Sequence, residues 1–471
     1  MSIKRLLATE TLDPNGALPR WITPGVRRLG WEAWTLPTHE AVQMLGPLVY
    51  ASMVVQIVEQ LRPHVLLVCP PYDYLSPDSC RQIRALGTRI IGLTFDDPLF
   101  EEIWGKAAWT DLRERFDLWA TTTVNGPTIE AGAKPVLWVM APESVEIDDP
   151  AAPAHEAVLI GRCTPEREAV ARAVASAGVH IACYGPGWAN GPVTRPSMLG
   201  LMRRSRVVIT PCNGTNAVKG AMIEAALVGS RQIIEYSHSL EQYILSQKRP
   251  ATYRTPKECA ERLLSDKPLP DWSDVPSWNT EWPKLIADMT LAEQPERSRS
   301  PALEQLYASL AHTYEQHNYM LAAMACLKTW SNAAPNDWGP KFALARCAHN
   351  SGQWAKAIDL TRKIDQALER HIPAAATNLR AFIPEGVQGK GLGNSGAVDS
   401  RLEIVAIRLH SLLMDNQLDV ALEEVDAMSD ACRAAVRATM IFDHDIPDAD
   451  ELAKALVNST IADSEGADLH S

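Results

Sequence analysis

Two oppositely charged residues lie close together in an otherwise apolar stretch of this 471-residue sequence. Lys219 stands near the start of an alanine-, methionine- and leucine-rich segment, and Glu224 follows it within the same segment. A cation and a carboxylate at the point where a strand ends and a helix begins form one of the arrangements that bind nucleotides. A surface lysine and a half-exposed glutamate on an ordinary helix are the alternative interpretation.

The stretch around this pair is predicted to be strand, turn, helix and strand. The β-branched run 207–210 suits a buried parallel strand, and the turn-forming residues 211–216 interrupt it. The helix is expected to begin at Ala217 and to end at Gly229, because glycine commonly terminates helices. Residues 232–235 then begin the next strand.

The first part of the chain, residues 1–148, repeats the same alternation. Strands are expected at 3–8, 32–36, 65–69, 89–95, 117–121 and 136–139, and helices at 24–29, 53–61 and 79–86. Repeated strand–helix units predict a parallel sheet with helices on both faces. Ligands of such sheets bind beyond the carboxyl ends of the strands. That edge of the predicted sheet carries Asp13, His39, Asp96 and Asp97.

A proline-rich linker precedes a second α/β domain, expected at 154–266. Its first strands are predicted at 157–160 and 180–184. Thr164 is a good N-cap for the helix between them, Pro165 a good first helical residue, and Gly178 a good terminator. The tryptophan- and proline-rich residues 267–299 are expected to form a return segment that packs across both domains.

From 300 to 455 the pattern becomes entirely helical. Leu310, Asn318, Ala323 and Pro335 align with residues 34 positions later, a period that resembles the helix-turn-helix unit of tetratricopeptide repeats. Residues 409–425 look like a third, degenerate copy. Such an array offers a groove for a protein partner or a contact for self-association. The acidic tail 456–471 is expected to be disordered.

Composition narrows the class of protein. The net charge of −12 divides into −6 for residues 1–150, +3 for 151–290 and −9 for the remainder. The single positive segment favours an anionic ligand there, whereas a general nucleic-acid-coating role is excluded. Nine scattered cysteines without a Cys-x-x-Cys pair, no signal-peptide core and no apolar run of membrane-spanning length predict a cytoplasmic protein without a membrane span.

Two further motifs are discounted. Residues 391–396 match the dinucleotide pattern G-x-G-x-x-G, but no strand precedes them. The Asp-x-Asp matches at 443–445 and 448–450 lie outside both α/β domains. We therefore expect neither a dinucleotide nor a metal ion to be bound at these places.

Five short motifs in order carry a family resemblance. They are FDDP at 95–98, IGRCTPER at 160–167, YGPGW at 184–188, VKGAMIEA at 218–225 and IEYS at 234–237. Together they resemble the CgeB-like (spore-maturation type) glycosyltransferases across roughly residues 1–265. The resemblance implies two Rossmann-like domains in the GT-B arrangement, the first on the acceptor side and the second binding a nucleotide-diphosphate sugar such as a UDP-sugar. It implies no cofactor and no metal.

The resemblance also assigns roles to residues. It implies that Glu224 binds the donor ribose, and two hydroxyl protons can indeed be accepted by one carboxylate. It implies that Lys219 faces the donor diphosphate. The family usually has a second cation, arginine, where this chain has Ala221. Arg162 or Arg167 are the candidates to replace it.

Turns complete the implied donor site. Gly161 matches the turn where the backbone approaches the diphosphate, and Gly185 matches the turn near the nucleobase. Asn213, in the turn before the apolar helix, is included with them. Strand-to-helix geometry alone is the alternative explanation for both glycine turns.

A base for the acceptor hydroxyl is expected in the first domain. Asp96 or Asp97 is the first candidate, with His39 and Asp13 as the next ones. The alternative is that Asp97 belongs to a turn and Asp96 caps the following helix.

The sequence thus predicts a metal-independent glycosyltransferase that moves a hexosyl or pentosyl group to an acceptor hydroxyl. The acceptor is open: a protein, a polysaccharide, a small metabolite or a hydroxymethylated base of phage DNA. A non-catalytic scaffold built on a degenerate transferase, with repeats for protein binding, is the main alternative. A sugar-nucleotide epimerase is the third.

Overall fold

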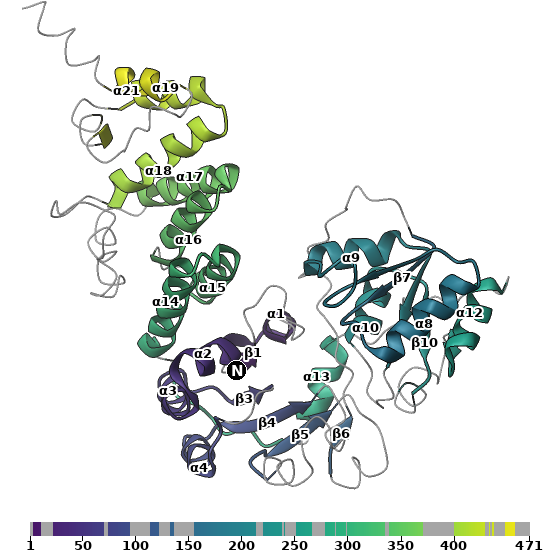
Figure 1. Ribbon diagram of the computed structural model, residues 1–471. Coiled ribbons are helices and arrows are strands. Elements are labelled where there is room, and N and C mark those ends of the chain that lie inside the picture. Colours follow the sequence, from purple (N-terminus) through teal and green to yellow (C-terminus); the bar gives the residue numbers. More distant parts are fainter. Residues whose placement is uncertain are drawn as a thin grey trace, which may run out of the picture. The chain divides into compact units, whose positions relative to one another are not determined.

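The chain divides into two compact units, Met1–Ala302 and Leu303–Ser471 (Figure 1). The computed structural model describes residues 3–10, 22–69, 74–94, 114–121, 132–135, 155–212, 220–237, 240, 251–265, 278–287, 289–297, 299–334, 339–370, 400–428, 433, 436–437 and 448–456.

The first unit contains two sheets in which every strand pairing is parallel. The first sheet has the order β2-β1-β3-β4-β5-β6. Its strands are β1 (Arg5–Glu10), β2 (Glu32–Pro37), β3 (Val65–Val68), β4 (Arg89–Thr94), β5 (Leu118–Thr121) and β6 (Lys134–Pro135). The predicted α/β class with Rossmann-like domains is confirmed.

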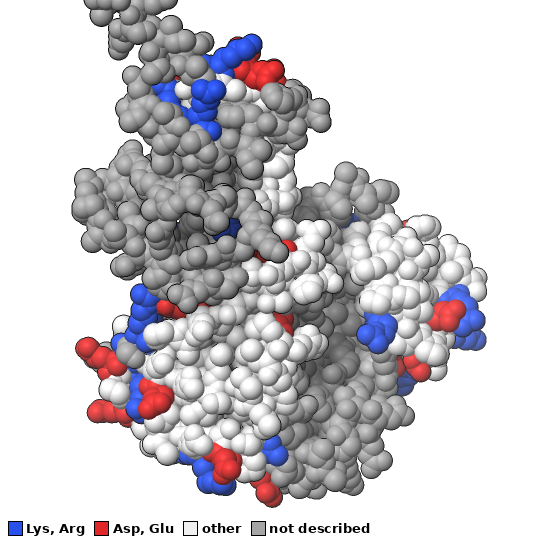
Figure 2. All heavy atoms as spheres, turned by 60° about the vertical axis from the view of Figure 1, so that its left-hand side comes forward, with Lys and Arg blue, Asp and Glu red and all other residues white. Residues whose placement is uncertain are grey.

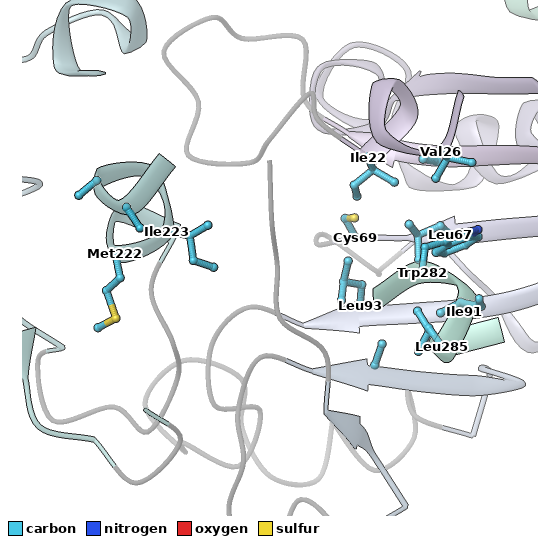
Figure 3. Packing of buried hydrophobic residues seen from close by; sticks show 14 of the residues in the cluster. Ile22, Val26, Leu67, Cys69, Ile91, Leu93, Met222, Ile223, Trp282 and Leu285 are labelled. Atoms are coloured by element: carbon cyan, nitrogen blue, oxygen red, sulfur yellow. The ribbon is translucent and has the colours of Figure 1, made fainter. Parts of the chain in front are cut away.

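Alternation along the strands sends side chains to the two faces of the first sheet. On one face α1 (Ile22–Arg28) and α13 (Trp278–Ile286) cover the sheet. Figure 3 shows Trp282 and Leu285 of α13 beside Leu67 and Ile91 of the strands. All four side chains are almost fully buried. The tryptophan-rich segment therefore completes the core of a sheet whose strands come from the first third of the chain.

Some expected elements of this sheet differ in the structure. α3 (Pro47–Leu61) begins at Pro47 rather than at residue 53, because Gly46 at φ +79° ends α2 (Thr38–Leu45) and proline suits a first helical position. α2 itself was not predicted. α4 (Pro77–Ala85) lies where a helix was expected. The expected strand 136–139 falls outside the described residues, and the observed β6 precedes it.

The second sheet has the order β11-β10-β9-β7-β8. Its strands are β7 (Ala157–Ile160), β8 (Ile181–Tyr184), β9 (Val207–Thr210), β10 (Gln232–Glu235) and β11 (Ala251–Tyr253). The first four follow the predicted positions. β11 and the helix α12 (Pro256–Leu264) were not predicted, because a three-residue strand carries too short an alternation to be recognised.

The same alternation separates the helices of the second sheet. Val158, Val208 and Ile234 lie in a core cluster with residues of α9 (Arg195–Arg204) and α10 (Gly220–Leu227). Leu159 and Ile209, each one position further on, join a cluster with α8 (Pro165–Ser176) and α12. The buried β-branched strands thus serve both layers.

Residues 290–297, which follow α13, form hydrogen bonds and an ion pair with residues of the first sheet. The guanidinium of Arg5 donates to the carbonyl of Pro295 (2.6 Å), and that of Arg89 donates to the carbonyl of Thr290 (3.1 Å). Arg297 pairs with Glu32 at 3.6 Å. Residues 290–297 therefore belong structurally with the first sheet.

The second unit is helical, as predicted. Its elements are α14 (Pro301–Gln316, which begins within the first unit), α15 (Met320–Ala333), α16 (Gly339–Asn350), α17 (Trp354–Arg370), α18 (Ser400–Met414), α19 (Leu418–Asp426) and α21 (Ala449–Ala455). Three of its helix–helix turns share one conformation. Asn318, Gly352 and Asn416 have φ of 60°, 72° and 55°, and a fully buried alanine follows each of them on the next helix. Those alanines are Ala323, Ala357 and Ala421.

None of the described helices combines the length and the apolar composition needed to cross a membrane.

Candidate functional site

The order of strands in the second sheet gives its carboxyl edge a topological switch point. β7 pairs with β8 on one side and with β9 on the other, so the connections after β7 and β9 leave in opposite directions. Ligands of open parallel sheets bind at such a switch point. α8 follows β7 and α10 follows β9, so both helices begin at the carboxyl edge of the sheet, where helix N-termini favour anions.

The turn between β7 and α8 is built for a close backbone approach. Gly161 has φ +135°, a conformation that favours glycine. Thr164 caps α8 by accepting a hydrogen bond from the Arg167 N–H (3.4 Å), and Pro165 begins the helix. The predicted cap is confirmed, and it directs the first turn of α8 to the carboxyl edge.

A second glycine turn, at Gly185, packs directly against the turn at Gly161. Gly185 has φ +131°, and a Cβ on this residue would lie 2.3 Å from the Gly161 carbonyl oxygen. The indole N–H of Trp188 donates to the same oxygen (2.9 Å). The Cys163 N–H donates to the Pro186 carbonyl (2.8 Å). The two turns that the motifs predicted therefore pack against each other and form one corner at the carboxyl edge.

Arg167 lies beneath this corner and is half-buried. A Cβ on Gly161 would lie 2.2 Å from its Nη1, and Nη1 donates to the carbonyl of Arg162 (2.9 Å). Within the described part of the chain, its buried Nε has no hydrogen-bond partner. Burial lowers the pKa of Arg167. Electrostatic interactions with Tyr253, Cys212 and Glu235 oppose that change. The side chain remains a cation with an unused donor.

The sequence motifs gave no role to two residues that act electrostatically on Arg167, Glu235 and Tyr253. Glu235 ends β10, and its Oε2 accepts a hydrogen bond from the Cys212 N–H (2.5 Å). Tyr253 ends β11 with its hydroxyl buried, and burial raises its pKa far above the ordinary value. Among the described residues, neither the Tyr253 hydroxyl nor that of Thr210 has a hydrogen-bond partner. Each of these residues ends a strand, and that position is the feature of the sequence that could have identified them as site residues.

Glu224 lies on α10 and is buried, with 6% of its surface exposed. Its Oε1 accepts a hydrogen bond from the guanidinium of Arg195, the first residue of α9. Burial raises the pKa of Glu224, and Arg195 opposes that rise. Sequence reasoning missed Arg195 because its partner is on a different helix and no motif joins the two.

The remaining expected site residues are distributed as follows. Arg162 is exposed, and its backbone carbonyl accepts the hydrogen bond from Arg167. His39 is exposed on α2, where its Nε2 lies 3.1 Å from Gln43 Nε2. Asp13, Asp96, Asp97, Asn213 and Lys219 lie outside the described residues.

The carboxyl edge of the first sheet has its own switch point, between β1 and β3. There the Cys69 N–H donates to the Thr9 hydroxyl (2.6 Å). Thr38, which begins α2 next to His39, is 2.8 Å from the Tyr50 hydroxyl. His39 is therefore at the edge where the strand order predicts a ligand.

No protein-family model and no curated protein matches the chain. Several solved structures are similar in fold. The glycosyltransferase AviGT4, involved in avilamycin A biosynthesis, is 15% identical over 68% of this chain and 98% of that chain, with a TM-score of 0.36. HepE of Anabaena in complex with UDP-glucose is 13% identical over 56% of this chain and 89% of its own, with a TM-score of 0.39. The UDP-GlcNAc 2-epimerase of Methanocaldococcus jannaschii, in complex with UDP-GlcNAc and UDP, is 7% identical over 61% and 99%, with a TM-score of 0.39.

Proposed function

We propose that this protein is a metal-independent, cytoplasmic glycosyltransferase that moves a sugar from a nucleotide-diphosphate sugar to an acceptor hydroxyl. The observation that carries the proposal is the arrangement at the carboxyl edge of the second sheet. Two interlocked glycine turns, the start of α8 and the half-buried Arg167 lie at this edge, and α10 begins there as well. Buried hydroxyls of Thr210 and Tyr253 without partners in the described residues suit a ligand that supplies them.

The donor diphosphate is proposed to lie between the N-termini of α8 and α10. When the sugar–phosphate bond breaks, negative charge grows on the departing nucleoside diphosphate. Backbone N–H groups at these helix N-termini and the guanidinium of Arg167 are proposed to stabilise that charge. Lys219 is proposed to add a second cation, and the glycine turn at Gly185 to lie beside the nucleobase.

Glu224 is proposed to hold the donor ribose. A side chain in a helix leans towards the helix N-terminus, which here is the carboxyl edge of the sheet. One carboxylate oxygen is bonded to Arg195, and a carboxylate has acceptor sites for ribose hydroxyls in addition.

The acceptor is proposed to approach from the first sheet. His39 is exposed at its carboxyl edge and can take a proton from a hydroxyl group in its neutral form; Asp96 and Asp97 are the other candidates for that role. The helical unit, with its three equivalent turns, is proposed to bind a protein partner or a second copy through a tetratricopeptide-like surface.

A protein or polysaccharide acceptor agrees better with the charge than duplex DNA does. On the face in Figure 2, the described basic and acidic side chains are interspersed. A duplex is bound by a continuous basic surface.

Donor hydrolysis tests the proposal. The full-length protein is incubated with UDP-sugars and the release of nucleoside diphosphate is measured, with calorimetry of a nucleotide panel alongside. Glu224→Ala and Lys219→Ala are expected to lower turnover and donor affinity at least tenfold. Exposed Arg172→Ala on α8 serves as the matched control. Full turnover and affinity in both site variants would overturn the assignment.

A non-catalytic scaffold is the second candidate, and the ion pair of Glu224 with Arg195 is the observation that favours it. A carboxylate already neutralised by a neighbour needs no ligand. A scaffold should bind no nucleotide in the micromolar range, so the same calorimetry separates the two functions.

A further inference from the structure

The guanidinium of Arg195 comes from a different helix to a place beside the proposed donor site. It hydrogen-bonds to Glu224, and the side chain of Arg195 retains 20% of its exposure. Ala221 precedes Glu224 by one helical turn, so positions 221 and 224 lie on the same face of α10. Arg195 therefore places a guanidinium beside Glu224, one helical turn from the small residue Ala221.

Chain direction puts this contact at the ligand-binding edge. α9 connects β8 to β9, so its first residues lie at the carboxyl ends of the strands. α10 follows β9, and its N-terminus lies at the same edge. Arg195 is the first residue of α9, and the carboxylate of Glu224 leans towards the N-terminus of α10. α9 and α10 also pack on the same face of the second sheet.

We propose that Arg195 is a further cation, beside Arg167 and Lys219, for the anionic part of the donor and that Glu224 holds it in place. This inference rests on the proposed function and names the residue that faces the phosphates next to α10. A guanidinium presents five donors in a fixed plane, so one edge can bind a carboxylate while another faces phosphate oxygens. Burial of Glu224 fixes that plane, because a carboxylate removed from water keeps its cationic partner.

Arg195 could instead only neutralise Glu224, and that alternative predicts a different result. Removing Arg195 would then free the carboxylate for ribose hydroxyls and would strengthen the binding of a nucleoside. If Arg195 faces the phosphates, removing it weakens the binding of a nucleoside diphosphate and leaves the nucleoside itself nearly unaffected.

Calorimetry with the full-length protein measures both effects. The probes are the tightest-binding of ADP, CDP, GDP and UDP, its nucleoside, and inorganic pyrophosphate. Arg195→Gln is expected to weaken the diphosphate and pyrophosphate at least tenfold and the nucleoside less than twofold. Arg203→Gln, an exposed change on the same helix, is the matched control and should leave all three affinities unchanged.

A conservative variant separates a binding role from a structural one. Arg195→Lys keeps a cation at the same position and should retain most of the diphosphate affinity that Arg195→Gln loses. A purely structural Arg195 would lower the melting temperature while leaving the ratio of diphosphate to nucleoside affinity unchanged. That result, or tighter binding in Arg195→Gln, would overturn the inference while leaving the proposed function intact. A wild-type protein that binds none of the four diphosphates would overturn both.

Discussion

Replacing Gly185 by alanine tests whether the two interlocked turns define the candidate site. The residue has φ +131°, and its new Cβ would lie 2.3 Å from the carbonyl oxygen and 2.6 Å from the carbonyl carbon of Gly161. Both contacts are to backbone, so no side chain can rotate away. A positive φ costs a non-glycine residue about 1–2 kcal/mol. Displacing packed atoms adds about 1–3 kcal/mol. The expected loss of unfolding free energy is therefore about 2–5 kcal/mol.

Gly191 offers the matched control in the same loop. It has φ +67°, but nothing lies within 4 Å of a Cβ placed there. Gly191→Ala should therefore cost only the backbone share, about 1–2 kcal/mol. Denaturant unfolding gives both free energies, and calorimetry gives the nucleoside diphosphate affinity. Gly185→Ala should also weaken that affinity, because the turn at Gly161 must move. Equal effects of the two replacements would refute the claim that close approach, rather than φ alone, requires glycine at 185.

Two further predictions concern stability. Burial, with Arg5 and Lys4, lowers the pKa of His64 to about 4, and its Nδ1 accepts the Arg5 N–H (3.0 Å). His64 therefore binds a proton more tightly in the unfolded chain than in the folded one. Its contribution to the free energy of unfolding is fully present above the unfolded pKa of about 6.5. It is lost as the pH drops towards 4, and the free energy of unfolding is lower by about 2 kcal/mol at pH 5. His64→Asn keeps an acceptor but does not titrate; hydrogen exchange in β1 should therefore become less pH-dependent than in the wild type, and an unchanged dependence would contradict the assignment. In the second unit, Ala357→Leu should destabilise by about 1–3 kcal/mol without changing nucleotide affinity, because Ala357 is fully buried. Exposed Ala355→Leu is its control, and equal melting temperatures would refute the packing argument.

The sequence was most informative where local chemistry decides the structure. Val207–Thr210 and Ala157–Ile160 are strands because uninterrupted β-branched and apolar runs suit a sheet covered on both faces. Thr164 and Pro165 begin α8 as predicted, since capping depends on adjacent residues. Two elements were not predicted. β11 has only three residues, too few to show the alternation of a strand, and α2 follows its strand directly, so no turn residues mark its start.

The partners of the site residues could not be predicted, because tertiary packing selects them. Nothing near Glu224 in the sequence points to Arg195, which comes from the preceding helix. Glu235 and Tyr253, which act electrostatically on Arg167, end two separate strands. The motif at 234–237 identified the right stretch without giving Glu235 a role.

The connection of α13 to the first sheet has a consequence for synthesis of the chain. Trp282 and Leu285 complete that core, and Pro295 accepts a hydrogen bond from Arg5 in the first strand. A nascent chain thus has all the strands of the second sheet outside the ribosome before the first sheet receives its last helix. The domain that begins the sequence finishes folding after the one that follows it, and a fragment ending at residue 148 leaves an apolar face open to aggregation.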